Sequence, residues 1–377
     1  MKSFFSFFKL MDHELKKGFY MLIIVLIFSS VLETLGIALI FPILKFLIDP
    51  QYLRNFVEIY LPFIDFKNFS NSFLITISIL IVIFVFALKN LIIFSILFYQ
   101  NSYIKKFITK ITKKIFQNYL NLDYFLYKKK NHSAIIKTLD HDSVVLFNNL
   151  VNCATLISEF FFIFLICSLL LFLSPKAMLI TVSFFIIGSG SFLLITKKKI
   201  KLWANDKNKA SVKKISSIKE MINSMRELKL YDLRNFFIKE FSLINFNYFN
   251  VHRKQNLIYN LPKLWIEIIT IIAVFILIYF LIIVRSDQIN IVEILPLLGL
   301  YVGSSFKLIP SFNKIIVSLQ SLRFIQPILK EYNDEYNLKN TDQKDRFEKI
   351  IFDQNIILKD INFSYDQKPL IKNFNLE

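Results

Sequence analysis

Three lysines, Lys89, Lys263 and Lys307, lie within stretches that are otherwise almost entirely apolar. A charged side chain inside a bilayer costs roughly 2.5–3.5 kcal/mol on insertion scales, so each lysine requires a compensating interaction. Three ammonium groups at similar depth on three helices would create a positive patch in a water-accessible cavity. Such a patch favours a polyanionic headgroup, and phosphate or pyrophosphate fits its chemistry best. The sequence therefore predicts a headgroup-binding site at these lysines.

Carboxylates in the same apolar stretches offer a structural alternative, because Glu33, Glu159 and Glu267 would neutralise the lysines by pairing with them. Prolines next to two of the lysines favour the binding site instead. One directly precedes Lys263 and another follows Lys307 within one turn, and breaks in helices line cavities in membrane proteins.

The remaining reactive side chains do not form a catalytic centre. The sequence has no Ser/His/Asp set, no activated cysteine and no carboxylate pair beside a histidine, so no catalytic residue is assigned. The four histidines are scattered, which leaves a metal site unsupported. Cys153 and Cys167 lie about 21 Å apart along one helix, too far for a disulfide.

The composition is that of an integral membrane protein, with 55% hydrophobic residues, 43 Phe and six Gly in 377 residues. A bilayer helix needs about 20 apolar residues, and six stretches are long enough. No cleavable signal pattern precedes the first, which we interpret as a retained helix. The expected spans are Phe19–Ile48, Phe73–Phe98, Val145–Leu173, Ala177–Thr196, Ile258–Val284 and Val292–Leu319.

Basic residues distinguish the two sides of the membrane. Four, nine and fifteen Lys/Arg lie in residues 1–18, 99–144 and 197–257. The alternate connections carry two, one and one: residues 49–72, 175–176 and 285–291. Basic connections mark the cytoplasmic side, so both termini are expected in the cytoplasm of a bacterium, with the spans in its inner membrane. The net charge of +18 then faces anionic lipid, and no nucleic-acid partner is expected.

The end of the chain changes character. Residues 1–322 are the expected membrane domain, and residues 323–347 become polar and charged, which is typical of a linker. In residues 348–377, apolar and polar residues alternate over Ile357–Asp366 and Pro369–Leu376 around a tight turn, which predicts two short strands.

This strand pair resembles the start of the nucleotide-binding domain of ABC transporters. The resemblance implies that Tyr365 stacks on the adenine ring and that ATP and Mg²⁺ act in a completed transporter. Phosphate cradling needs a glycine-rich G-x-x-x-x-G-K-[ST] turn, and all six glycines lie upstream in other patterns. We therefore expect residues 1–377 alone to hold no cofactor and neither to bind nor to hydrolyse ATP.

The two long cytoplasmic segments have apolar residues at a spacing of three to four, which predicts helices that continue below the membrane. ABC exporters use such extensions, joined by short crossing helices, to contact their ATPase domains. The resemblance implies coupling helices at Asp123–Lys128 and Glu227–Arg234. Their apolar contact residues are expected to be Tyr124, Phe125, Leu230 and Tyr231. Two solvated helical hairpins without a partner are the alternative.

Outside the membrane, residues 51–61 place their apolar side chains on one face and end at a proline, which predicts an interfacial amphipathic helix. Tyr52, Phe56 and Tyr60 on that face are expected to contact a lipid tail. The alternative is a helix that only caps the first hairpin.

Scattered stretches narrow the resemblance to PglK-type flippases of lipid-linked oligosaccharides. They are Glu33–Ile43 (E-T-L-G-I-A-L-I-F-P-I), the outer amphipathic helix, Pro262–Glu267 (P-K-L-W-I-E) and Lys307–Ile315 (K-L-I-P-S-F-N-K-I). The family favours arginine at cavity positions where this sequence has lysine. Lysine keeps the charge but not the bidentate geometry of a guanidinium on phosphate.

The expected fold is thus all-α in the membrane, with six helices extended into the cytoplasm and a short β start of a nucleotide-binding domain. The resemblance implies a homodimeric exporter that flips a polyprenyl-pyrophosphate-linked glycan or related glycolipid, powered by an ATP-binding domain downstream. Alternatives are an exporter of another lipid (lipid A-like) or of a peptide, a truncated remnant without transport activity, and a six-span channel or sensor.

Overall fold

The computed structural model describes residues 7–8, 10–39, 71–173, 175–284, 291–338, 357–365 and 368–376. The chain divides into two compact units, Met1–Lys339 and Asn340–Glu377. Within the described ranges the first unit is helical and the second is a two-stranded sheet.

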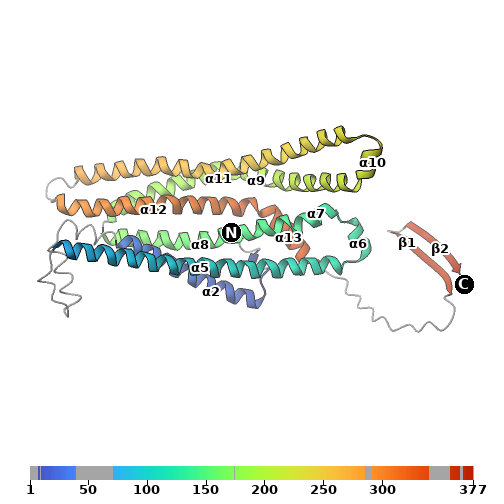
Figure 1. Ribbon diagram of the computed structural model, residues 1–377, viewed down its shortest axis with the longest axis horizontal. Coiled ribbons are helices and arrows are strands. Elements are labelled where there is room, and N and C mark those ends of the chain that lie inside the picture. Colours follow the sequence, from blue (N-terminus) through green and yellow to red (C-terminus); the bar gives the residue numbers. More distant parts are fainter. Residues whose placement is uncertain are drawn as a thin grey trace. The chain divides into compact units, whose positions relative to one another are not determined.

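Five long helices run side by side in the first unit (Figure 1). They are α5 (Asn71–Leu120), α8 (His141–Leu173), α9 (Pro175–Asn223), α11 (Arg234–Val284) and α12 (Ile291–Phe324). Helix α2 (His13–Ala38) packs against α5 and α8. The short helices are α6 (Tyr124–Lys129), α7 (His132–Leu139), α10 (Met225–Leu230) and α13 (Gln326–Tyr336).

Three of these helices are much longer than a membrane is thick. Helices α5, α9 and α11 contain 50, 49 and 51 residues. At about 1.5 Å per residue each is roughly 75 Å long, whereas the hydrocarbon core is about 30 Å thick. By length and composition, three described helices are able to cross a bilayer: His13–Ala38, Ile79–Leu120 and His132–Phe172. The long helices therefore extend well beyond the membrane, as their periodicity predicts.

Local signals end the long helices and begin the short ones. The Asn131 side chain accepts a hydrogen bond from the Ser133 amide (2.9 Å) and caps the start of α7. Between α10 and α11 the backbone of Asp232 is left-handed, with φ of 52°, a conformation that aspartate tolerates better than most residues. The chain reverses at both places, and α6 and α10 lie at the same end of the helical unit (Figure 1).

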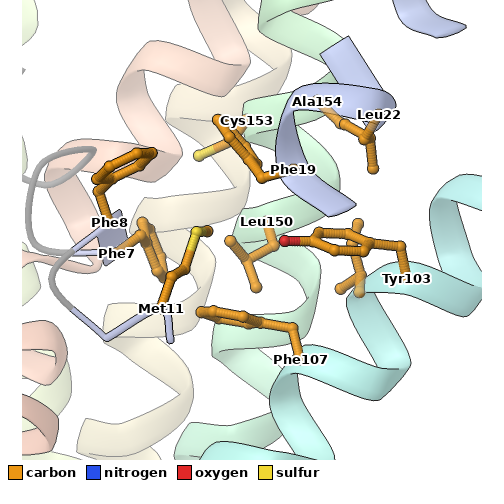
Figure 2. Close-up of a pocket in the computed structure, with 11 residues that line it drawn as sticks. Phe7, Phe8, Met11, Phe19, Leu22, Tyr103, Phe107, Leu150, Cys153 and Ala154 are labelled. Atoms are coloured by element: carbon orange, nitrogen blue, oxygen red, sulfur yellow. The ribbon is translucent and has the colours of Figure 1, made fainter. Parts of the chain in front are cut away.

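An apolar core anchors the N-terminal segment to the bundle. Phe7, Phe8 and Met11 pack with side chains from α2, α5 and α8, among them Phe19, Phe107 and Leu150 (Figure 2). The Tyr103 hydroxyl donates to the Leu15 carbonyl (2.7 Å), so this polar group is satisfied. A cavity of about 20 Å³ remains between these apolar side chains, and such a space stays dry. This cluster stabilises the fold and offers no contact for a charged headgroup.

The prediction that residues 323–347 are a linker is wrong for their first part. Residues 326–336 form helix α13, which packs on α5 and α9. Ile328, Leu329 and Tyr332 recur at helical spacing and are buried. The Asn118 amide donates to the carbonyls of Glu335 (3.1 Å) and Tyr336 (2.9 Å), which satisfies the end of the helix. The polar composition of this segment obscured three apolar residues at helical spacing. Their burial is enough to pack one short helix against the bundle.

The second unit is an antiparallel pair of strands, β1 (Leu358–Tyr365) and β2 (Lys368–Leu376). Ile361 lies opposite Phe374 and Phe363 opposite Ile371, so apolar residues meet across the strands as their alternation predicts.

Two glycines of α9 provide a matched test of helix packing. A Cβ at Gly188 would lie 2.1 Å from Ile269 Cδ1 of α11, and the Gly188 carbonyl accepts a hydrogen bond from the Trp265 indole (3.1 Å). A Cβ at Gly190 would meet no atom within 4 Å. Glycine at 188 thus permits close approach of α9 and α11.

We expect Gly188→Ala to destabilise the protein by about 1–3 kcal/mol through overpacking. Gly190→Ala should be neutral or stabilise by up to about 1 kcal/mol, because alanine favours the helix. Melting temperatures of both variants in the same detergent measure the difference. Equal melting temperatures would show that α9 and α11 do not depend on this contact.

Candidate functional site

Lys89 lies on α5 where that helix meets α2. Its ammonium is so close to the α2 backbone that a Cβ at Gly36 would be 3.0 Å from Lys89 Nζ. The same ammonium lies 4.5 Å from the centre of the Phe86 ring, within range of a cation–π contact. Glycine at 36 therefore makes room for the lysine.

Charges from two other helices act on Lys89, namely those of Lys307 on α12 and Glu33 on α2. The structure thus brings two of the three candidate lysines within electrostatic reach of one another. Lys263, on α11, is exposed. It precedes Ile266, which shares a core cluster with Leu308 and Phe312 of α12. No described interaction joins Lys263 directly to the other two lysines.

The three carboxylates that could pair with the lysines, Glu33, Glu159 and Glu267, differ in their partners. Glu159 on α8 forms an ion pair with Lys314 of α12 and not with any of the three lysines. Among the described side chains, no ion pair within 4 Å joins Lys89, Lys263 or Lys307 to Glu33 or Glu267. The charge of Glu33 nevertheless acts on Lys89, so this carboxylate partly compensates the lysine.

Sequence reasoning missed Lys314, although it lies in the same apolar stretch as Lys307. A signal was present, because the two lysines are seven residues apart, which places them on one face of a helix two turns apart. Both are exposed, whereas Leu308, Phe312 and Ile316 of the neighbouring face are buried.

The expected coupling helices correspond to short helices in the structure. Asp123–Lys128 coincides with α6 to within one residue. Glu227–Arg234 overlaps α10, but α10 ends at Leu230 and Arg234 already begins α11. Tyr124, Leu230 and Tyr231 are 73%, 69% and 73% exposed, so most of their apolar surface is uncovered within the described part of the chain. Phe125 lies in α6, and its side chain is outside the described set.

The structure gives little about the two other expected sites, the outer amphipathic helix and the adenine-stacking tyrosine. Tyr52, Phe56 and Tyr60 lie outside the described residues. Tyr365 is the last residue of β1, opposite Lys368 in the second unit.

A buried ionic cluster connects four helices near α6. Lys137 of α7 bonds Asp142 of α8 (2.9 Å) and Glu331 of α13 (3.1 Å). The Asn208 amide of α9 donates to the other oxygen of Glu331 (2.6 Å). The side chains of Lys137 and Asp142 are 1% and 0% exposed. The cluster therefore joins α7, α8, α9 and α13 to one another.

A polar cavity of about 20 Å³ adjoins the cluster, between α8, α9 and α11. The Lys207 ammonium at its wall donates to Gln255 (2.8 Å), and burial lowers the pKa of Lys207 while the Asp142 charge opposes the shift. Burial and the nearby positive charges of Lys207, His141 and Lys214 lower the pKa of His252 to about 4, so this imidazole is neutral at pH 7. The cavity is large enough for one water, with Ser211 Oγ and Asn208 Oδ1 as candidate partners.

The described helices thus include three that extend past the bilayer, with the short helices α6 and α10 at one end of the unit (Figure 1). Residues 19–302 match the family model of the ABC transporter transmembrane region, and the chain belongs to that family. Membership places it in a membrane and implies an ATPase partner.

Proposed function

We propose that this chain is the six-span membrane domain of a homodimeric exporter in a bacterial inner membrane. It flips a polyprenyl-pyrophosphate-linked oligosaccharide or a related glycolipid outward. ATP and Mg²⁺ drive the cycle at an ATPase domain of which residues 348–377 are the first strands. The observation that carries the substrate class is that the charge of Lys307 on α12 acts on Lys89 of α5.

Two like charges near each other in a membrane domain are unfavourable unless water or an anion compensates them. Glu33 supplies one negative charge near Lys89, and among the described side chains no ion pair within 4 Å compensates Lys307. A pyrophosphate carries several negative oxygens and accepts charge-assisted hydrogen bonds from more than one ammonium. The site therefore suits a headgroup with two adjacent phosphates better than a neutral lipid.

The exposed short helices support the coupling part of the proposal. Leu230 and Tyr231 present apolar surface at the end of the α9–α11 hairpin, outside the expected spans. Exposed apolar side chains at the end of a long hairpin are suited to fill grooves of another domain. The ATPase domain is the partner that the family implies.

Substitution of the three lysines tests the substrate. In a transporter that contains the ATPase domain, we expect Lys89→Gln, Lys263→Gln and Lys307→Gln each to weaken the apparent affinity of lipid-stimulated ATPase activity. A charge-assisted contact is worth about 1.5–3 kcal/mol, which corresponds to roughly ten- to a hundred-fold. Lys→Arg at each position should be tolerated, since arginine binds phosphate bidentately.

The same variants distinguish a headgroup site from internal ion pairs. If the lysines are structural, Lys89→Gln should lower the melting temperature, and a second change, Glu33→Gln, should restore it. If they bind the headgroup, the melting temperature should stay close to wild type while lipid stimulation falls. Stable variants with an unchanged lipid response would refute the headgroup site.

A further inference from the structure

We propose that a groove at the tip of the α9–α11 hairpin, beside α10, binds an amphipathic anion with a single apolar chain, such as a medium-chain fatty acid. The chain of the ligand lies in the groove, and its charged head lies at Lys229 and Arg234. The groove is separate from the lysines of the spans, so its ligand is independent of the substrate proposed above.

The groove is a cavity of about 360 Å³ between the ends of α9 and α11, which diverge toward α10 (Figure 1). Apolar side chains at a spacing of three to four residues form most of its wall, so one face of each helix contributes to it. They are Ile218, Met221, Met225, Leu228, Phe237 and Phe241. Leu228 is buried, whereas Met225 and Phe241 are 42% and 37% exposed, so part of this apolar wall is open to solvent.

The volume of the groove favours an extended chain over a single inserted side chain. Small-molecule sites in proteins typically have volumes of about 300–1,000 Å³, and the groove falls in this range. A methylene group is similar in size to a water molecule, whose share of the liquid is about 30 Å³, so the groove holds roughly twelve carbons. Met221 and Met225 can adapt to such a chain, because methionine is unbranched and has several rotatable bonds.

The charged residues that line the groove are both basic. Among the described residues around it these are Lys229 and Arg234, and no carboxylate lines it. Lys229 forms no ion pair within 4 Å among the described side chains. Arg234 bonds Asp232 through Nε (2.9 Å) and Nη2 (2.8 Å), but both side chains are largely exposed, and such pairs are weak. A carboxylate head would therefore gain charge-assisted hydrogen bonds at this end of the groove.

The position of the groove along α9 determines how a ligand reaches it. Residue 218 is 22 positions after Thr196, where the expected fourth span ends, or about 33 Å along the helix. A ligand therefore reaches the groove through water. A single acyl chain attaches only weakly and reversibly to a membrane, so an anion with one chain can leave the bilayer and bind here.

A photoreactive dodecanoate tests the site in residues 1–377 reconstituted in nanodiscs. The probe carries a diazirine at the end of its chain, and mass spectrometry of peptides locates the crosslinks. We expect crosslinks within residues 217–241, whereas a probe dissolved in the bilayer would react with the spans. Unlabelled dodecanoate should displace the probe, and octanoate should do so at least about tenfold less well, since each buried methylene contributes about fourfold in affinity. Crosslinks confined to the spans would overturn the site.

Two comparisons test the charge of the ligand. The double variant Lys229→Gln, Arg234→Gln should raise the half-saturating concentration of the probe about tenfold or more. Lys239→Gln changes an exposed lysine of α11 that does not line the groove, so this matched control should bind normally. In the wild-type chain, dodecyltrimethylammonium should compete at least about tenfold less well than dodecanoate. Equal competition by the two would show that the groove accepts any apolar chain and would overturn the assignment of an anion.

A larger side chain in the wall tests where the apolar chain lies. Met225→Trp should occupy the groove and abolish crosslinks within residues 217–241, while its melting temperature stays close to wild type because Met225 is partly exposed. Amide exchange gives a second readout, since the bound chain contacts Met225 and Leu228 of α10. With dodecanoate at ten times its Kd, exchange in α10 should slow about tenfold. Unchanged crosslinking in folded Met225→Trp, or unchanged exchange in α10 of the wild-type chain, would overturn binding in the groove.

Discussion

Replacing Lys137 with methionine should destabilise the protein by about 3–5 kcal/mol, because it leaves a charged carboxylate buried without its cation. Asp142 is 0% exposed, and Lys137 is its ion-pair partner at 2.9 Å. His141 Nδ1 lies 3.3 Å from the other Asp142 oxygen and cannot replace a lysine that also bonds Glu331. We expect a large fall in melting temperature in detergent.

The exposed pair between Lys106 and Glu14 provides a matched control. Its atoms are as close, at 2.7 Å, but the two side chains are 62% and 65% exposed. Lys106→Met should therefore cost less than about 1 kcal/mol. The double variant Lys137→Met, Asp142→Asn removes both buried charges and should recover most of the stability lost in Lys137→Met. If Lys137→Met melted no lower than Lys106→Met, burial of the cluster would have no energetic consequence.

The second large effect is expected at α10. In a transporter that contains the ATPase domain, Leu230→Asp and Tyr231→Asp should abolish transport while ATP hydrolysis continues. Both side chains are exposed in this chain, so a charge there does not disturb its core. It would instead place an unpaired carboxylate in the apolar groove that receives the helix, which is costly. Tyr124→Asp and Phe125→Asp at α6 should act in the same way.

Conservative changes control for the loss of side-chain shape. Leu230→Met and Tyr231→Phe keep the apolar surface and should retain transport. Flipping of a fluorescent lipid and release of phosphate, measured on the same proteoliposomes, give the ratio of transport to ATP turnover. Transport at the wild-type rate in the aspartate variants would show that these helices do not couple the two domains.

The sequence by itself determined the features that depend on neighbouring residues. Apolar runs and a spacing of three to four residues predicted helices such as α5, which continue beyond a membrane span, because both signals act within a few turns. The breaks at α6 and α10 were expected within a few residues for the same reason. The strand pair from Leu358 to Leu376 was equally readable, since alternation is a local pattern.

Tertiary structure alone decided which charges meet. Glu159 and Lys314 are 155 residues apart in sequence, and Lys137 and Glu331 are 194 apart. In a chain with 46 basic residues, many lysines and arginines are possible partners for a buried carboxylate. Which of them forms the ion pair depends on which helix faces are packed together. Helix α13 shows the same limit, because its polar sequence becomes a docked helix only when α5 and α9 cover Ile328, Leu329 and Tyr332. Composition and periodicity are properties of a segment, whereas an ion pair is a property of two surfaces, and only the packed helices bring those surfaces together.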